Sequence, residues 1–167
     1  MLMKLGFIGT GKITVSVVNG ICKSKIPFKR ILVSSRNKTK ALKLKKKFKK
    51  VDIAKTNQEI VDKCNWVFLA VTPRVGEQIL PELNFRSNQK IISFISTINL
   101  AQLKKIVKKR AKIVRAIPLP PISLGKGPVP ICPPDNQVKN FFNKIGTTVE
   151  IRSEKLSKNF WATSGMM

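Results

Sequence analysis

Short apolar runs alternate with amphipathic segments along most of the chain. Eight apolar runs predict β-strands, at residues 5–8, 31–34, 51–54, 66–71, 90–95, 112–116, 129–132 and 147–151. Between them, apolar residues recur three and four positions apart and predict helices, one directly after Gly11 and others at residues 37–50, 57–62, 100–107 and 138–145. We expect Asn37 to be the N-cap of the helix at residues 37–50, and another helical segment to begin at residue 153. Strands that alternate with helices in this way are typical of a doubly wound, mostly parallel α/β sheet.

The segment KLGFIGTGKIT, residues 4–14, joins the first predicted strand to the first predicted helix through a glycine turn. Gly9 allows a tight turn, and Gly11 allows a phosphate group to approach the backbone. The third position of this glycine pattern is Thr14, where Gly or Ala is usual. Because the N–H groups and the dipole of a helix N-terminus favour a diphosphate, the turn predicts dinucleotide binding; the alternative is a purely structural turn.

Three residues at the end of the second predicted strand, Ser34, Ser35 and Arg36, indicate which dinucleotide is bound. Proteins that bind NAD place an acidic residue about 20 positions after the glycines, where it binds the ribose hydroxyls. This chain has no carboxylate there, and Arg36 offers a fork of donors for a 2′-phosphate. The sequence therefore favours NADP over NAD; the alternative is that Arg36 is a surface residue at the strand end.

Two later segments are expected on the nicotinamide side of this site. The apolar run at residues 66–71 stops at Thr72 and Pro73, and the cofactor of an open α/β sheet lies across the carboxyl ends of the strands. Residues 118–130 are rich in Pro and Gly, so we expect a shaped loop without a helix. This loop is either a wall of the nicotinamide pocket or a rigid connector.

The composition excludes several kinds of chemistry. The 167 residues include no histidine and no tyrosine, which removes the usual general base, the commonest metal ligand and a Tyr-Lys catalytic pair, so we expect no metal site. Cys22, Cys64 and Cys132 are far apart and predict buried, reduced thiols. We expect one main domain, and a cytoplasmic protein with neither a secretory signal nor an apolar run of roughly 20 residues.

The chain carries 33 Lys and Arg against 8 Asp and Glu, a formal net charge of +25. A charge of this size attracts nucleic acid, so a basic nucleic-acid-binding module is a second hypothesis. The lysines, however, are spread over the whole chain, and no aromatic residues alternate with them as base stacking would require. We interpret most of them as exposed helix faces and expect no specific nucleic-acid partner.

Five segments follow one another in a fairly specific order: GFIGTGKIT, VSSR, VFLAVTP, IISFIS with LAQL, and VRAIPLPPISLGKG. Together they resemble the N-terminal half of the pyrroline-5-carboxylate reductase family. The resemblance implies a Rossmann domain that binds NADPH or NADH, followed in the family by a helical domain that forms the dimer and supplies most of the substrate site. It also implies hydride transfer to the C=N bond of a cyclic imine, which forms proline.

The resemblance assigns cofactor-binding residues by position, but no catalytic proton donor. They form a pyrophosphate loop, an adenosine phosphate site, an adenine contact and a nicotinamide side, in that order: Ile8, Gly9, Thr10, Gly11, Lys12 and Ile13; Ser34, Ser35 and Arg36; Asn57; Ala70, Val71, Thr72 and Pro73 with Ile95, Ser96 and Thr97. Two departures concern the substrate. The family has Met-Pro-Asn-Thr-Pro where this chain has Ile-Pro-Leu-Pro-Pro at residues 117–121, and its helical half is missing after residues 161–165.

We therefore predict that residues 1–152 form an NADP-binding Rossmann domain and that residues 153–167 begin the connection to the missing helical domain. The predicted function is that of an NADP-dependent oxidoreductase acting on a C=N bond of a small imine. The alternatives are a related reductase of another imine or ketone, and a non-catalytic nucleotide-binding module. We expect the intact protein to be a homo-oligomer through the missing half and this chain to be a monomer.

Overall fold

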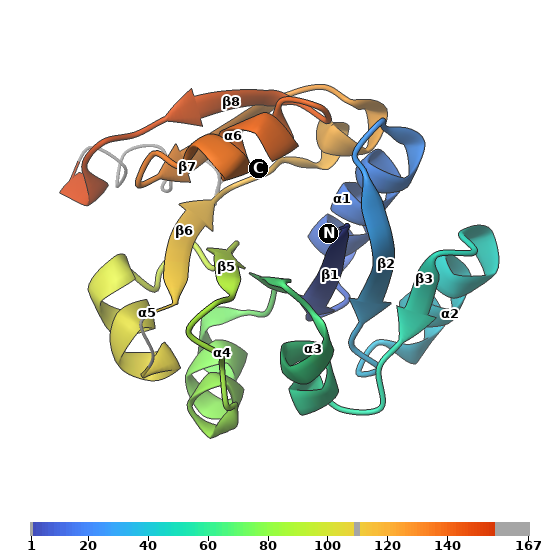
Figure 1. Cartoon of the computed structure of the whole chain (residues 1–167), viewed down its shortest axis with the longest axis horizontal. Helices are drawn as coiled ribbons and strands as arrows, with labels where there is room; N and C mark the ends of the chain where they lie inside the picture. The colour runs from blue at the N-terminus through green and yellow to red at the C-terminus, as the bar shows by residue number, and fades with distance from the viewer. Residues whose placement is uncertain (1, 109–110, 156–167) are drawn as a thin grey trace.

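Strands and helices alternate along residues 2–108 and 111–155, the part of the chain that the computed structural model describes (Figure 1). The strands are β1 Met3–Ile8, β2 Phe28–Val33, β3 Val51–Ile53, β4 Trp66–Leu69, β5 Lys90–Ser93, β6 Lys112–Ala116, β7 Pro128–Cys132 and β8 Thr147–Glu150. The α-helices are α1 Lys12–Lys23, α2 Lys38–Lys47, α3 Asn57–Lys63, α4 Pro73–Ile79, α5 Leu100–Val107 and α6 Asn136–Phe142. Two short 3₁₀-helices are η1 Leu80–Glu82 and η2 Pro120–Leu124.

The eight strands in the described part of the chain form one sheet in the order β3-β2-β1-β4-β5-β6-β7-β8. The strands from β3 to β6 are parallel, β7 runs antiparallel to β6, and β8 is parallel to β7. The chain moves outward from β1 to β3 and then returns to place β4 on the other side of β1. This confirms the predicted doubly wound, mostly parallel sheet, and it puts the topological switch point between β1 and β4.

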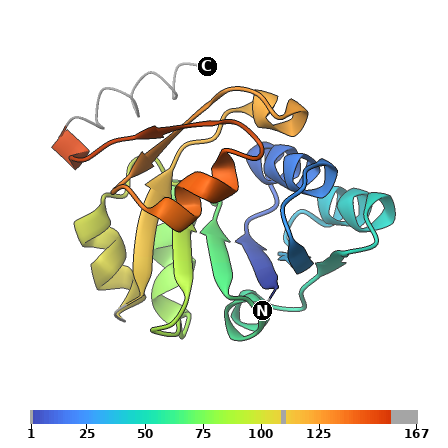
Figure 2. The same ribbon diagram turned by 45° about the horizontal axis from the view of Figure 1, so that its top comes forward.

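Helices cover both faces of the sheet, which is why the central strands are apolar on both sides. On β4, Trp66 and Phe68 face a core shared with α1, α2 and α6, whereas Val67 and Leu69 face a core shared with α3 and α5. The ring of Phe68 stacks on that of Phe7 in β1, with 4.4 Å between the centroids. Figure 2 shows α6 lying across the first of these two faces.

Among the described residues, side chains cap four of the six α-helices. Asn37 caps α2, as the sequence predicts, by accepting a hydrogen bond from the Lys40 N–H, and Thr56, Asn99 and Asp135 cap α3, α5 and α6 in the same way. Helix α1 starts after Gly11, which has no side chain, and α4 starts after Thr72, whose side chain makes no capping bond. Both uncapped helices begin beside the switch point, after β1 and β4.

Several expectations about elements are wrong. Residues 118–130 contain the 3₁₀-helix η2, because proline is tolerated in a first helical turn, where no N–H is needed. For the same reason Pro73 begins a helix, α4, that the sequence did not predict. The strands expected at residues 31–34, 51–54, 66–71, 90–95 and 147–151 end one or two residues earlier, and the helix expected at 37–50 ends at Lys47. The helix expected from residue 153 lies mainly outside the described residues.

Candidate dinucleotide-binding site

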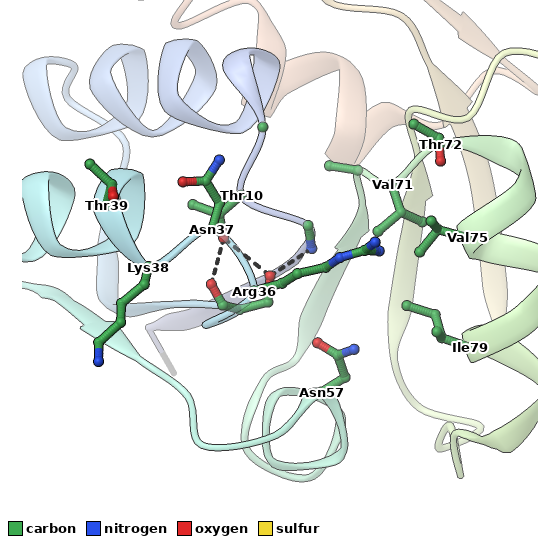
Figure 3. A pocket seen from close by; sticks show the side chains of 14 residues that line it. Thr10, Arg36, Asn37, Lys38, Thr39, Asn57, Val71, Thr72, Val75 and Ile79 are labelled. Atoms are coloured by element: carbon green, nitrogen blue, oxygen red, sulfur yellow. Dashed lines mark hydrogen bonds between the residues drawn. The ribbon is translucent and has the colours of Figure 1, made fainter.

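A cavity of about 570 Å³ lies at the switch point between β1 and β4 (Figure 3). Nine of its lining residues are ones that the sequence assigns to cofactor binding: Gly9, Thr10, Gly11, Ser34, Arg36, Asn57, Ala70, Val71 and Thr72. Five others were not expected there: Asn37, Lys38, Thr39, Val75 and Ile79. Segments that are far apart in the sequence therefore meet at one edge of the sheet, as the parallel topology requires.

Gly9 has a backbone conformation that other residues rarely adopt. Its φ is +102°, and a Cβ atom at this position would lie 2.3 Å from the Ala70 carbonyl oxygen. The Gly9 N–H donates to Ser34 Oγ (2.9 Å), and Thr10 Oγ1 donates to the Ser34 carbonyl oxygen (2.6 Å). The buried Ser34 therefore holds the glycine turn against the end of β2. The sequence predicts for Ser34 only a role in binding the adenosine phosphate.

Gly11 differs from Gly9, because its backbone is extended and accessible to any residue. Apart from its chain neighbours, no described residue has an atom within 4 Å of the place where a Cβ would be. The packing of the protein therefore does not require glycine here, and the open space fits a ligand phosphate next to the α1 N-terminus. The unusual Thr14 is accommodated as well: it is fully buried and donates from Oγ1 to the Gly9 carbonyl oxygen (2.7 Å).

The far side of the cavity is basic. Arg36 and Lys38 are exposed residues that line it, and no Asp or Glu is among its described lining residues. Figure 3 shows the Arg36 side chain extending across the cavity toward Val71 and Val75, with Asn57 at the start of α3 below it. A ligand with several phosphate charges would meet cations and helix N-termini here, and no opposing carboxylate.

The remaining wall is apolar. Val71, Val75 and Ile79 line it, and the last two belong to α4. This helix packs closely on the segment after β5, because a Cβ on Gly76 would lie 3.0 Å from Ile95 Cδ1. The sequence missed Val75 and Ile79 because it missed α4. Their spacing of four residues, directly after a proline, was the available signal.

Eight predicted cofactor-binding residues do not line this cavity: Ile8, Lys12, Ile13, Ser35, Pro73, Ile95, Ser96 and Thr97. Ile8 and Ile95 are buried in the core between the sheet and α3 to α5. Lys12 lines a second cavity of about 580 Å³ between α1 and α2, together with lysines of α2. Contact between these eight residues and a cofactor stays a prediction.

The three cysteines are free thiols, as the sequence predicts, and Cys64 and Cys132 are buried, but Cys22 is only half-buried where a buried thiol was expected. Burial raises the pKa of the half-buried Cys22 to about 11 and that of the buried Cys64 to about 12, and it also raises the pKa of Cys132. All three thiols therefore stay protonated at neutral pH. Within residues 2–108 and 111–155, no three His, Cys, Asp or Glu side chains gather into a possible metal site, and no helix has the length and apolarity to cross a membrane.

Comparison with known proteins places these features in a family. A sequence model of the family described as NADP oxidoreductase, coenzyme F420-dependent, matches residues 4–99, more than half of the chain. Pyrroline-5-carboxylate reductase 3 of Danio rerio is 30% identical over 128 residues, which are 75% of this chain and 44% of the relative.

Two solved structures have the same fold. The pyrroline-5-carboxylate reductase of Coxiella burnetii superposes with a TM-score of 0.84 at 24% identity, over 98% of this chain and 64% of the other. The pyrroline carboxylate reductase of Plasmodium falciparum, with NADP bound, gives a TM-score of 0.81 at 23% identity, over the same shares. The chain thus spans less than two thirds of the length of these three relatives. It has a nicotinamide-dinucleotide-binding oxidoreductase fold, and it belongs to the NADP oxidoreductase family, among the pyrroline-5-carboxylate reductases.

Proposed function

We propose that this chain is the NADP-binding domain of a pyrroline-5-carboxylate reductase-like oxidoreductase, which transfers hydride to the C=N bond of a cyclic imine in proline biosynthesis. One observation carries the proposal. The cavity at the switch point combines a glycine turn, an uncapped helix N-terminus and Arg36, and no carboxylate is among its described lining residues. NAD-binding sites use an acidic residue for the ribose hydroxyls, and a 2′-phosphate requires a cation instead.

The residues present fit this cofactor. The open space beside Gly11 and the first turn of α1 would accept the diphosphate, and Arg36 with Lys38 would bind the 2′-phosphate. The apolar wall made by Val71 and α4, toward which the Arg36 side chain extends, would pack against the bound coenzyme. When bound, the cofactor supplies the hydride, and the chain's task is to bind and orient it.

The relatives support the substrate part of the proposal by their names alone, because the chain spans only part of their length. A related reductase acting on another imine or a ketone is the second candidate. It is favoured by residues 117–121, where Ile117 is buried and Pro120 and Pro121 open η2, so no amide or hydroxyl side chain stands in this run. Assay of the intact protein with pyrroline-5-carboxylate and with 2-oxo acids distinguishes the two candidates.

Calorimetric titration of the purified chain with NADPH and NADH tests the cofactor proposal. We expect saturable binding of both, with NADPH the tighter ligand. Arg36→Asp should weaken NADPH binding by about 10- to 100-fold, because charge-assisted hydrogen bonds are lost, and should change NADH binding by less than about threefold. Arg152→Asp is the matched control, since it makes the same charge change at an exposed arginine after β8.

The same titration separates the proposal from its rival. Equal losses for the two coenzymes in Arg36→Asp would show that Arg36 does not bind the 2′-phosphate. Absence of saturable binding to either coenzyme would reject the dinucleotide site. If duplex DNA bound tightly and its affinity survived an increase in salt concentration, a nucleic-acid-binding module would be the better explanation of the +25 charge.

A further inference from the structure

The second cavity, of about 580 Å³ between α1 and α2, is separate from the proposed coenzyme site. Its described lining residues and those of the first cavity have no member in common. The two cavities are still neighbours, because Gly11 lines the first and Lys12 the second, and Thr39 lines the first and Lys40 the second. Figure 2 shows the two helices side by side, α1 in blue and α2 in cyan.

Each of these helices contributes one face to the cavity. The lining residues are Lys12, Val15, Ser16 and Asn19 on α1, and Lys40, Lys43, Leu44 and Lys47 on α2. Within each set the second, third and fourth members follow the first by three, four and seven positions, a spacing that places all four on one side of a helix. The two faces are joined by a hydrogen bond from Lys47 Nζ to Asn19 Oδ1 (2.7 Å). Lysines of two helices therefore gather in one groove.

These four lysines have no acidic partner. All eight Asp and Glu residues of the chain lie within residues 2–108 and 111–155, and none of them lines the cavity or forms an ion pair with Lys12, Lys40, Lys43 or Lys47. Like charges three or four positions apart on a helix repel each other, as Lys43 does with Lys40 and with Lys47. Lys12 is also the first residue of α1, where the helix dipole disfavours a cation. A bound anion would relieve this repulsion.

The other lining residues make the groove more than a patch of exposed charge. Val15 is half-buried, Leu44 is buried, and Pro120 of η2 is the third apolar member of the lining. Cations beside walls of low dielectric constant attract an anion more strongly than cations on an open surface. Ser16 Oγ forms no hydrogen bond with any described residue, so it offers a further donor on α1.

The spread of the lysines indicates what kind of anion fits. Lys40 and Lys47 are seven positions apart on α2, which corresponds to about 10 Å along the helix axis. One phosphate group cannot reach lysines at both ends of such a face, whereas several linked phosphates can. Each ammonium group is a point charge with three donors and accepts phosphate oxygens without a fixed orientation. The volume of the cavity is that of a small-molecule site.

We propose that the groove between α1 and α2 is a second anion-binding site, which takes a small ligand with three or more linked phosphate groups. Inorganic polyphosphate and a nucleoside triphosphate share this chemistry. The inference goes beyond the proposed function and does not depend on it, because the two cavities have separate linings. It also gives a role to part of the +25 charge, which coenzyme binding leaves unexplained.

Calorimetric titration of the full chain with sodium tripolyphosphate tests the site. A salt concentration of about 0.1 M is suitable, because it largely screens exposed charges more than about 10 Å apart. We expect saturable binding, and the double substitution Lys40→Gln with Lys43→Gln should weaken it at least about tenfold, because two charged donors are lost. Glutamine and lysine have similar helix propensities, so α2 should be kept, and thermal unfolding checks this.

Two control variants locate the bound phosphates. Lys46→Gln with Lys49→Gln removes the same charge at exposed lysines that do not line the cavity, and should change the affinity by less than about twofold. Equal losses in the two double variants would show that the net charge, and not this groove, attracts the phosphates. Arg36→Gln should also have less than about a twofold effect. If it weakened binding as much as the substitutions in the groove, the phosphates would lie in the coenzyme cavity and the inference would be wrong.

Two further ligands identify the source of the phosphates. Guanosine triphosphate that binds more tightly than tripolyphosphate, and loses affinity in the Lys40 and Lys43 variant, would support a nucleotide whose ring packs on the apolar residues. Weaker binding of this nucleotide would support an inorganic chain. If a short DNA duplex bound more tightly than either ligand and lost affinity in the same variant, the small-ligand assignment would be wrong. Absence of saturable tripolyphosphate binding to the unaltered chain would overturn the inference.

Discussion

The N–H of Gly9 donates to the hydroxyl oxygen of Ser34 over 2.9 Å, and this hydrogen bond ties the turn after β1 to the end of β2. The two residues are separated by 25 positions in the sequence. Thr10 adds a second link by donating to the Ser34 carbonyl oxygen. The shape of the glycine turn is thus fixed from the neighbouring strand, and the N-terminus of α1 faces the cavity as a result.

Gly9→Ala should destabilise the protein by roughly 2 kcal/mol or more, because a Cβ would collide with the Ala70 carbonyl oxygen and the positive φ would add strain. Denaturant unfolding measures the loss. Gly125→Ala is the control, since Gly125 also has a positive φ of +71° but has open space around its Cβ position, among the described residues. A loss in Gly9→Ala no larger than that of the control would contradict the collision.

Gly11→Ser should have the opposite pattern. The hydroxyl of serine can cap α1, and nothing in the described protein fills the space of its Cβ, so the free energy of unfolding should stay within about 0.5 kcal/mol or rise. NADPH affinity should fall at least about tenfold, because the side chain takes the place of the ligand phosphate. Calorimetry and thermal unfolding on one sample measure both quantities. Unchanged NADPH affinity would show that no phosphate lies beside Gly11.

Asp135→Asn should cost roughly 2–4 kcal/mol of stability, because it leaves the Lys90 ammonium group buried without its charged partner. The two groups lie 2.5 Å apart, with exposed fractions of 7% for Lys90 and 18% for Asp135, and asparagine can still cap α6. Asp52→Asn is the control: it removes a partner of the more exposed ion pair with Arg30 and should cost less than about 1 kcal/mol. Equal costs in urea unfolding would argue against this mechanism.

The same carboxyl group should make stability depend on acid. Burial alone would raise the pKa of Asp135, but hydrogen bonds from Lys90 and the Val138 N–H outweigh it and hold this pKa below its ordinary 3.8. A lowered pKa in the folded state gives stability that is present above pH 4 and is lost as the pH falls through the folded value. Unfolding measured from pH 5 to pH 2 should show this loss, and Asp135→Asn should flatten it.

The Cys64 thiol should give a dependence of the reverse sign at high pH. Burial raises its pKa from 9.0 to about 12, so above pH 9 the unfolded chain ionises this thiol while the folded chain does not. The free energy of unfolding should therefore fall between pH 9 and pH 12. This fall should be less steep in Cys64→Ala. Because the variant keeps every lysine, titration of the lysines contributes equally to both proteins and does not account for the difference. In the native state at pH 8, iodoacetamide should label Cys64 far more slowly than in urea. Equal labelling rates would contradict its burial.

Local sequence patterns determined much of this protein. Helix α5 and strand β6 have the predicted bounds, and Asn37 caps α2 as expected, because apolar spacing and capping side chains act within a few neighbouring residues. The glycine turn was predicted as well, because a positive φ favours glycine and the helix begins only a few residues later in the sequence. The order of strands and helices alone predicted the parallel sheet and the edge of the sheet at which the cavity lies.

Only the tertiary structure decided what individual side chains do. Ser34 supports Gly9, and Arg115 links Ser96 to Glu154, through contacts between residues separated by 19 to 39 positions. Helix α4, whose first residue is a proline, supplies the apolar wall through Val75 and Ile79. Hydrogen bonds and ion pairs of this kind depend on which strands the fold brings side by side, and the periodicity of a single segment carries no information about its distant partners.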